Sequence, residues 1–135
     1  MSGARVVLDT SAYSHFRRGH ALLVDRMARA DVVLVPTVVI GELEAGFRCG
    51  SRYAENDRGL SELLDEPFVC VVDVNAGTAR AYGRIFAQLR QAGTPIPTND
   101  IWIAACATQQ AAQLLTFDRH YGAIADLDVR TFAPA

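Results

Sequence analysis

Four acidic residues stand where the predicted secondary-structure elements begin or end. Asp9 and Asp118 each follow a short apolar run with the composition of a buried β-strand. Asp100 lies in the first turn of an apolar helix, where the helix dipole favours a carboxylate. Glu42 flanks the apolar stripe of another helix. Because the carboxyl ends of parallel strands open on one rim, Asp9 and Asp118 are expected to share that rim, and we hypothesise that all four acids converge there.

Convergence of these acids has a chemical consequence. Two carboxylates about 4 Å apart repel each other by roughly 1 kcal/mol in water and by about 4 kcal/mol at an effective dielectric constant of 20. A group of four is therefore expected to share protons or to recruit a cation. Oxygen ligands without a paired histidine or cysteine favour Mg²⁺ or Mn²⁺ over zinc. Such a cation holds a phosphate oxygen, lowers the pKa of a bound water and stabilises a leaving oxygen, which is the chemistry of phosphodiester hydrolysis.

Periodicity leaves open which glutamate of the helix predicted over residues 37–49 faces this rim. Glu42 and Glu44 flank the apolar stripe on opposite sides. Gly46 lies one turn after Glu42 on the same side, and its missing side chain would leave room for a metal, a water or another backbone. This arrangement favours Glu42, and it predicts that a bulky residue at position 46 impairs activity.

Strands alternate with helices along the chain, which predicts a layered α/β fold with a parallel sheet and right-handed crossovers. The chain shows no repeat, linker or shift in composition, so residues 1–135 are expected to form one domain. Buried stripes are predicted on the second helix (Leu22, Leu23, Met27 and Ala30) and on the fifth (Tyr82, Ile85, Phe86 and Leu89). Strands are predicted at residues 5–8, 32–35, 68–72, 113–117 and about 129–132. Helices are predicted at residues 13–17, about 20–29, 37–49, about 52–64 and about 75–92. A last helix is predicted from Thr98 onward, with Thr98 as its N-cap.

Composition narrows the class of protein. The formal net charge of −2 argues against a protein that coats nucleic acid electrostatically, but it is compatible with an acidic pocket bordered by basic residues. All 13 basic residues are arginine, a residue suited to bidentate phosphate contact, although a skewed codon composition is the simpler explanation. Residues 1–9 are too short and too charged for a signal peptide, and no apolar run is long enough to cross a bilayer, so a cytoplasmic protein is expected.

The cysteines and histidines form no ligand pattern. Cys49, Cys70 and Cys106 are odd in number and far apart, which argues against a disulfide framework or a zinc cage and predicts buried, reduced thiols. The histidines, expected at or near the surface, also form no ligand-spaced pair: His15, His20 and His120.

Four short motifs occur in a specific order and spacing: Asp9-Thr10-Ser11, Glu42-Leu43-Glu44-Ala45-Gly46, Asn99-Asp100-Ile101-Trp102-Ile103-Ala104-Ala105 and Leu115-Thr116-Phe117-Asp118. Together they resemble the PIN-domain ribonucleases, and among these most of all the VapC-type toxins of bacterial toxin–antitoxin pairs. The resemblance covers nearly the whole chain, including the long helix and Gly93 ahead of the third motif. Each motif is weak alone, so the specificity lies in their order and spacing.

The resemblance implies a PIN-like three-layer sandwich, with a central five-stranded parallel sheet flanked by helices. It assigns the catalytic and metal-binding roles, for Mg²⁺ or Mn²⁺, to Asp9, Glu42, Asp100 and Asp118. Three further polar residues match positions that line the pocket and orient water: Ser11, Thr116 and Asn99.

The same resemblance implies an activity and partners. The expected activity is that of a metal-dependent endoribonuclease, the toxin of a type II toxin–antitoxin system, in which metal-activated water attacks phosphorus in single-stranded or loop RNA. The expected partners are the RNA substrate, a cognate VapB-type antitoxin that often places a basic side chain in the acidic pocket, and a second copy of the chain in a homodimer. No membrane partner is expected.

Two features of the site stay open. Some family members carry a further acid near the last motif, a place that Asp126 would fill, so one-metal and two-metal chemistry both remain. Single-stranded RNA also needs stacking partners, for which Tyr13 and Phe16 are candidates and Trp102, more simply a core residue, is a weaker one. The candidates for a basic rim are Arg17, Arg18, Arg48 and Arg119.

Three other functions compete with the nuclease. A phosphatase with an aspartyl nucleophile would need a second acid two residues after Asp9, where the chain has Ser11. A phosphate-accepting receiver domain would need a lysine, and the sequence contains none. A catalytically silent PIN-like protein-interaction module would be marked by the loss of acids, whereas all four are present.

Overall fold

Five parallel strands form the centre of the protein, for which a computed structural model describes residues 5–134. In chain order they are β1 (Arg5–Leu8), β2 (Val32–Pro36), β3 (Val69–Val72), β4 (Gln113–Thr116) and β5 (Val129–Thr131). Across the sheet they lie in the order β3-β2-β1-β4-β5, and every neighbouring pair is parallel. Each predicted strand is present, with ends that differ from the prediction by no more than one residue.

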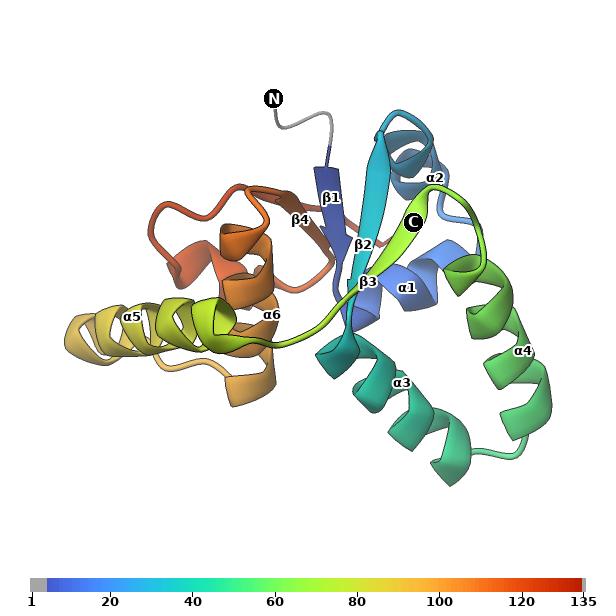
Figure 1. Ribbon diagram of the computed structural model, residues 1–135, viewed down its shortest axis with the longest axis horizontal. Coiled ribbons are helices and arrows are strands. Elements are labelled where there is room, and N and C mark those ends of the chain that lie inside the picture. The colour runs from blue at the N-terminus through green and yellow to red at the C-terminus, as the bar shows by residue number, and fades with distance from the viewer. Residues whose placement is uncertain (1–4, 135) are drawn as a thin grey trace.

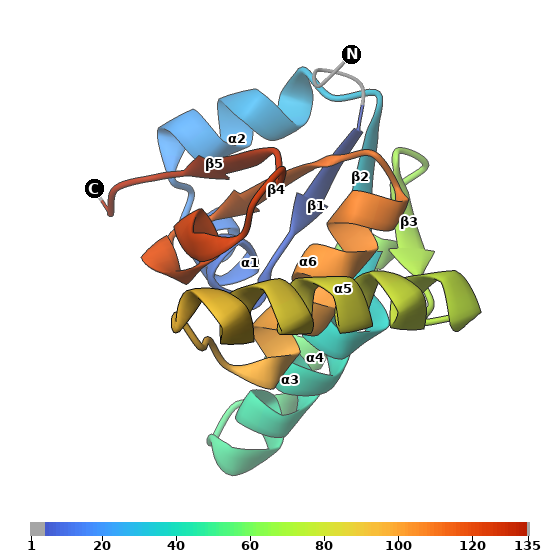
Figure 2. The same cartoon turned by 90° about the vertical axis from the view of Figure 1, so that its left-hand side faces the viewer.

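Helices cover both faces of this sheet, which confirms the predicted three-layer α/β fold. The α-helices are α1 (Thr10–Arg17), α2 (Ala21–Ala28), α3 (Thr37–Cys49), α4 (Tyr53–Leu64), α5 (Ala76–Ala92) and α6 (Thr98–Gln109), and a short 3₁₀ helix, η1, spans Arg119–Ala123. In Figure 1, α5 and α6 lie on one side of the sheet and α1, α3 and α4 on the other. The view in Figure 2 shows α6 behind α5, between that helix and the strands.

The strand order places the ends of β1 and β4 side by side. The two strands are in register, with Leu8 opposite Leu115, and the Asp9 amide donates to the Leu115 carbonyl at 3.3 Å. Val6, Val7 and Leu8 are fully buried because β1 has a neighbour on each edge and helices on each face. The residues that follow β1 and β4 therefore emerge together at the carboxyl edge of the sheet.

Helix α6 brings a third segment to that edge. Its residues Ile101 and Ile103–Ala107 are buried, as predicted for a helix that is apolar nearly all round. The preceding helix α5 begins at a capping box between Asn75 and Thr78 and ends at Gly93, whose φ of 70° is the left-handed conformation that glycine adopts readily. The prediction of Gly93 as the helix terminator is confirmed.

Several local predictions were wrong. Thr98 is the first residue of α6 rather than its N-cap, because Pro97 occupies the capping position and makes no side-chain cap. Leu22 and Phe86 are 61% and 40% exposed, since each lies at the solvent side of a stripe whose centre alone reaches the core. Helix α1 begins at Thr10 rather than Tyr13, because the Asp9 side chain caps it.

Only one of the three thiols is buried, in contrast to the prediction. Cys106 lies within α6, and burial raises the pKa of its thiol to about 11. Cys49 and Cys70 are exposed, one at the last turn of α3 and one on the open edge strand β3.

Within the described residues, no helix is both long and apolar enough to cross a membrane. Residues 1–4, part of the segment judged unlike a signal peptide, lie outside the described residues.

Candidate active site

All four predicted acids line one hollow at the carboxyl edge of the sheet. This acidic cleft has a volume of about 320 Å³. Its acids come from the end of β1, from α3, from the first turn of α6 and from the segment after β4. Its lining residues are Asp9, Thr10, Ser11, Ser14, Glu42, Asp100, Ile103 and Asp118, among which no lysine or arginine occurs.

Asp9 is the most buried of these acids, at 4% exposure. Its Oδ1 accepts hydrogen bonds of 2.8 Å from the Ala12 amide and from the Ser11 hydroxyl, and its Oδ2 accepts one from Thr116. Burial raises the pKa of the Asp9 carboxyl, these three hydrogen bonds oppose that rise, and the nearby charge of Asp100 adds to it. Asp9 is therefore a rigidly held carboxylate that favours a proton or a cation more than an exposed aspartate does.

Ser11 and Thr116 form a bridge between β1 and β4. Each hydroxyl donates its proton to Asp9, and each also accepts a backbone amide. The Phe117 amide donates to Ser11 Oγ at 3.0 Å, and the Asp118 amide donates to Thr116 Oγ1 at 2.9 Å. The two hydroxyls thus fix the carboxylate of Asp9 and the backbone that carries Asp118, and their role in orienting water stays a prediction.

Glu42, and not Glu44, faces the acidic cleft. The Thr10 hydroxyl donates to Glu42 Oε1 at 2.6 Å, and the Asn99 amide nitrogen donates to Oε2 at 3.3 Å. Glu44 turns to the other side, where it accepts from the Tyr53 hydroxyl at 2.7 Å. The argument from Gly46 was wrong, because Gly46 is exposed and a Cβ built there meets no atom within 4 Å. Glu42 is selected by its donors rather than by a small neighbour.

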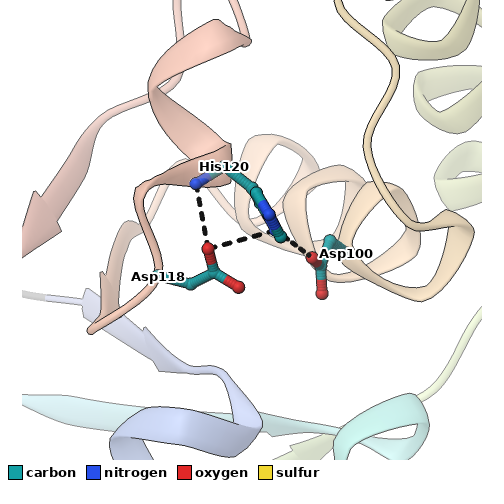
Figure 3. A group of neighbouring side chains, drawn as sticks. All are labelled: Asp100, Asp118 and His120. Carbon is teal, nitrogen blue, oxygen red and sulfur yellow. Dashed lines mark hydrogen bonds and ion pairs between the residues drawn. The ribbon is translucent and has the colours of Figure 1, made fainter.

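Asp100 and Asp118 face each other across His120 (Figure 3). The ring Nδ1 of His120 lies 3.3 Å from Asp100 Oδ2 and 3.1 Å from Asp118 Oδ1, and one ligand atom from each of the three residues lies within 4.8 Å of the others. Burial raises the pKa of the Asp100 carboxyl, the hydrogen bond from His120 opposes the rise, and the charges of Asp118 and Glu42 reinforce it. The His120 amide also donates to Asp118 at 3.0 Å, so the start of η1 orients this acid.

Tyr121 lies close to three acids of the cleft without lining it. Its side chain is fully buried, and its hydroxyl makes no hydrogen bond of ordinary geometry within the described residues. Burial, together with the charges of Asp9, Asp100 and Asp118, raises the pKa of the Tyr121 phenol far above its ordinary value. The hydroxyl therefore stays protonated beside the acids.

The donor set fits a divalent cation. Four carboxylates converge with no arginine or lysine in the lining, and burial, with a smaller contribution from the neighbouring acids, raises the pKa values of Asp9 and Asp100. Carboxylate oxygens are the ligands that Mg²⁺ and Mn²⁺ prefer. The imidazole of His120 occupies the gap between two of these acids, so it either joins the ligands or turns aside when a cation enters.

Comparison with known families identifies this arrangement. The sequence model of the PIN domain matches residues 6–127, which is nearly the entire chain. The protein belongs to the PIN-domain family. This confirms the resemblance seen in the four sequence motifs.

Ribonucleases of the VapC class are among its relatives. The chain is 31% identical over 97 residues to ribonuclease VapC4 of Mycobacterium tuberculosis, a match that covers 72% of this chain and 75% of that protein. It is 28% identical over 118 residues to ribonuclease VapC5 of the same organism, covering 87% and 86% of the two chains. The predicted likeness to VapC ribonucleases is confirmed.

Solved PIN-domain structures have the same fold. A chain from the crystal structure of VapBC2 from Rickettsia felis, bound to a promoter DNA fragment, aligns with a TM-score of 0.83 at 21% identity over 94% of this chain and 98% of that one. A chain of VapBC-5 from M. tuberculosis aligns with a TM-score of 0.75 at 26% identity over 97% and 99%. The five-stranded PIN fold is thereby confirmed.

Sequence reasoning missed two residues of this PIN-domain site. His120 is exposed, as predicted, but its contact with Asp118, two positions earlier in the chain, was not predicted. Thr10 was passed over between two named residues, yet its hydroxyl holds Glu42. In both cases the sequence offered a hint, because each residue lies within two positions of a predicted acid, Asp118 or Asp9.

Other candidates lie away from the acidic cleft. Asp126 is exposed in the loop before β5, with a φ of 61°, and does not line the cleft. Arg48 contacts Glu44 and the ring of Tyr53 on the α3–α4 hairpin. Arg119 is exposed on η1, whereas Arg17 and Arg18 line a neighbouring groove.

The proposed stacking residues are mostly covered. Tyr13 is only 2% exposed, so its ring cannot receive a base. Trp102 is half-buried on α6 and stacks on Tyr82 of α5, with ring centroids 4.0 Å apart. Phe16 is half-buried beside Tyr13 and packs against the core.

Proposed function

We propose that this protein is a metal-dependent endoribonuclease of the VapC class, the toxin of a type II toxin–antitoxin pair, which hydrolyses RNA phosphodiester bonds at the acidic cleft. The observation that carries the proposal is the convergence of Asp9, Glu42, Asp100 and Asp118 at the carboxyl edge of a PIN-domain sheet. Relatives at about 30% identity that bear the name ribonuclease support the reaction.

In this proposal the carboxylates hold one or two divalent cations, Mg²⁺ or Mn²⁺. The bound cation would supply a Lewis acid for a phosphate oxygen and a bound water of lowered pKa. Asp9, fixed by Ser11 and Thr116, forms the floor of the cation site, and Asp100 and Asp118 form its wall. Their convergence without a basic neighbour keeps the phosphodiester out until a cation reverses the local charge.

The remaining polar residues orient the acids. Thr10 and Asn99 hold the two oxygens of Glu42, so this carboxylate keeps one direction while its charge faces the cleft. His120 places a ring nitrogen between Asp100 and Asp118 and lowers their mutual repulsion before a cation binds. We assign no covalent nucleophile, since the cleft lining offers only hydroxyls that are already engaged with carboxylates or backbone.

We further propose the partners and place that accompany VapC proteins. These are a single-stranded or loop RNA substrate, a VapB-type antitoxin, a second copy in a homodimer, and the cytoplasm as the site of action. The relatives solved as VapBC assemblies support the antitoxin partner.

The test is cleavage of structured RNA by the purified, partner-free chain, with Mg²⁺, with Mn²⁺ and with EDTA. Cleavage should require the metal and should fall by at least about 100-fold in Asp118→Asn, because loss of an outer-sphere contact alone typically costs 10- to 100-fold in metal-site activity. The matched control is Asp31→Asn, the same change at an exposed residue before β2, at the opposite edge of the sheet. RNA cleavage that survives EDTA or survives Asp118→Asn would contradict the proposal.

A melting experiment tests cation binding without activity. A cation that binds only the folded chain at 100 times its dissociation constant adds about 2.7 kcal/mol of stability. The melting temperature should therefore rise on adding Mg²⁺ or Mn²⁺ to the wild type and to Asp31→Asn, but not to Asp118→Asn. A rise of equal size in all three proteins would place the cation elsewhere.

A further inference from the structure

A second groove adjoins the acidic cleft and is lined by residues of α1, α3 and α4. These three helices lie beside one another on the same side of the sheet (Figure 1). This arginine groove has a volume of about 300 Å³ and shares Ser14 with the acidic cleft. Its two basic residues, Arg17 and Arg18, have no acidic residue beside them in the lining. The lining residues are Tyr13, Ser14, Arg17, Arg18, Leu43, Phe47 and Asn56.

The two arginines of the arginine groove and the Tyr13 hydroxyl have no side-chain partner among residues 5–134, whereas the Ser14 hydroxyl donates to the Thr10 carbonyl at 3.2 Å. Neither Arg17 nor Arg18 forms a salt bridge in the described part of the chain. The Tyr13 hydroxyl is buried and makes no hydrogen bond within residues 5–134. Two exposed arginines that form no salt bridge in the described residues leave a positive charge that an anionic ligand can neutralise.

The Arg17 side chain packs against the backbone of α4. A Cβ built on Gly59 of α4 would lie 2.5 Å from Arg17 Nη2, so the guanidinium packs directly on the helix where glycine leaves room. Arg17 and Gly59 also line a second hollow that contains Glu62 and Glu66, but Arg17 forms no salt bridge with either glutamate. Planar guanidinium groups bind phosphate through paired N–H donors, and a preorganised one loses less entropy on binding.

We propose that the arginine groove binds the RNA segment that flanks the scissile bond, with Arg17 and Arg18 on consecutive phosphates and Asn56 available to the intervening nucleotide. The proposal rests on the nuclease function. Continuity through Ser14 favours RNA over a protein partner, because a strand whose phosphate lies in the acidic cleft passes directly into a hollow of the opposite charge. The acidic cleft would then cleave the phosphodiester bond, and the arginine groove would provide affinity for the RNA.

The experiment compares Arg17→Ala/Arg18→Ala with the matched control Arg84→Ala, an exposed arginine of α5 on the other side of the sheet. The probe is a fluorescein-labelled 2′-O-methyl RNA decamer of mixed sequence, titrated in EDTA and followed by anisotropy. The double variant should bind the probe about tenfold more weakly, and its slope of log affinity against log salt should become less negative by about 0.7 for each lost phosphate contact. Arg84→Ala should stay within twofold of the wild type.

Cleavage kinetics separate this proposal from the nuclease function. With Mg²⁺ or Mn²⁺, the double variant should raise KM about tenfold and leave kcat within about threefold, because the arginines contact the substrate away from the reacting bond. Wild-type protein that cleaves no RNA with either metal would remove the nuclease function and this proposal with it. Wild-type cleavage combined with an unchanged KM and unchanged probe binding in the double variant would overturn the arginine groove alone, even if the variant lost affinity for a protein partner.

Tyr13→Phe provides a second variant that removes only an oxygen atom. Because this hydroxyl is buried and has no partner within the described residues, probe affinity should stay within about twofold of the wild type. A loss of affinity as large as that of the double variant would show that binding does not depend on the arginine charges and would overturn the assignment to Arg17 and Arg18.

Discussion

The acidic cleft and the arginine groove are adjacent, but their polar side chains are satisfied in opposite ways. In the cleft, hydroxyl, amide and imidazole groups of the protein already hold Asp9, Glu42 and Asp118. In the groove, the cations and the hydroxyl of Tyr13 have no hydrogen-bonded partner within the described residues. The cleft is therefore preorganised and repels a phosphate until a cation binds, whereas the groove attracts a phosphate directly.

The comparison shows how a protein with a net charge of −2 can bind a polyanion such as RNA. The protein does not need a positive charge over its whole surface, because two hollows that share Ser14 have separate tasks. The acidic cleft positions a cation, and the arginine groove holds the RNA strand. The comparison also predicts different responses to chelation. EDTA should remove the function of the cleft and leave binding in the groove intact.

Replacing one cleft acid should give the largest effect. Asp100→Asn should lower metal-dependent RNA cleavage at least about 100-fold, because it removes a carboxylate from the cation site. The fold should survive, since the change relieves repulsion from Asp118 and Glu42. Activity against RNA and melting temperature in EDTA check the two halves of this prediction, and a large fall in the melting temperature at neutral pH would argue against a repelling cluster.

The stability of Asp100→Asn should also depend on pH in a defined direction. Because burial raises the pKa of Asp100 in the folded state, the folded protein binds this proton more tightly than the unfolded chain does. The stabilisation from the protonated carboxyl is complete below its ordinary value of 3.8 and is lost as the pH rises through the raised folded value. In EDTA, Asp100→Asn should therefore melt a few degrees above the wild type at pH 7, and this difference should shrink toward pH 4. A difference that grows on acidification would contradict the raised pKa.

Removing a partnered hydroxyl of the cleft should cost stability. Thr116→Val keeps the shape of the side chain but leaves Asp9 Oδ2 and the Asp118 amide without their buried partner. We expect a loss of about 1–3 kcal/mol in the free energy of unfolding, measured by urea denaturation. The matched control is Tyr13→Phe, an unpartnered hydroxyl of the groove, which should change the same quantity by less than about 0.5 kcal/mol. Equal losses in both variants would remove the contrast between the two hollows.

A smaller effect is expected where a glycine supports an arginine. In Gly59→Ala the new methyl group would displace the Arg17 guanidinium, which is the flexible end of a long side chain. The substitution should lower the affinity for the RNA probe by about threefold. Stability should not fall, because alanine is better than glycine in a helix by about 1 kcal/mol. Probe anisotropy and urea denaturation together decide this, and lost stability with unchanged affinity would mean that Arg17 has no role in RNA binding.

The fold was predictable because its signals are local. Apolar runs such as Val6–Leu8 and the terminator Gly93 fix elements without knowledge of their neighbours, and alternation of strands and helices then dictates a parallel sheet. Placement of Asp9 and Asp118 at one edge follows from the same logic. The sequence alone was therefore sufficient for the layers and for where the acids emerge.

The contacts of the site were less predictable because they depend on side-chain direction across elements far apart in sequence. Thr10 and Glu42 are 32 positions apart, and only the packing of α1 on α3 shows that they meet. The exposure of Leu22 and the pairing of Glu44 with Tyr53 likewise depend on which part of a helix face its neighbours cover. The periodicity of apolar residues shows which face of a helix is buried. Which side chains touch also depends on the angle at which the helix packs against its neighbours.

The smallest effect is expected at Gly46, where the structure reverses the expectation from sequence. Glycine at this position suggested close approach beside Glu42, but a Cβ built there meets nothing within 4 Å and the residue is exposed. Gly46→Leu should therefore leave RNA cleavage within about twofold of the wild type and should increase stability slightly, because leucine is a better helix former than glycine. Cleavage rates and urea denaturation of Gly46→Leu beside Gly59→Ala measure this. Two results together would contradict the roles assigned to the two glycines: a lower kcat in Gly46→Leu and an unchanged RNA affinity in Gly59→Ala. They would mean that the missing side chain matters beside the cleft acids at Gly46 and not beside Arg17 at Gly59.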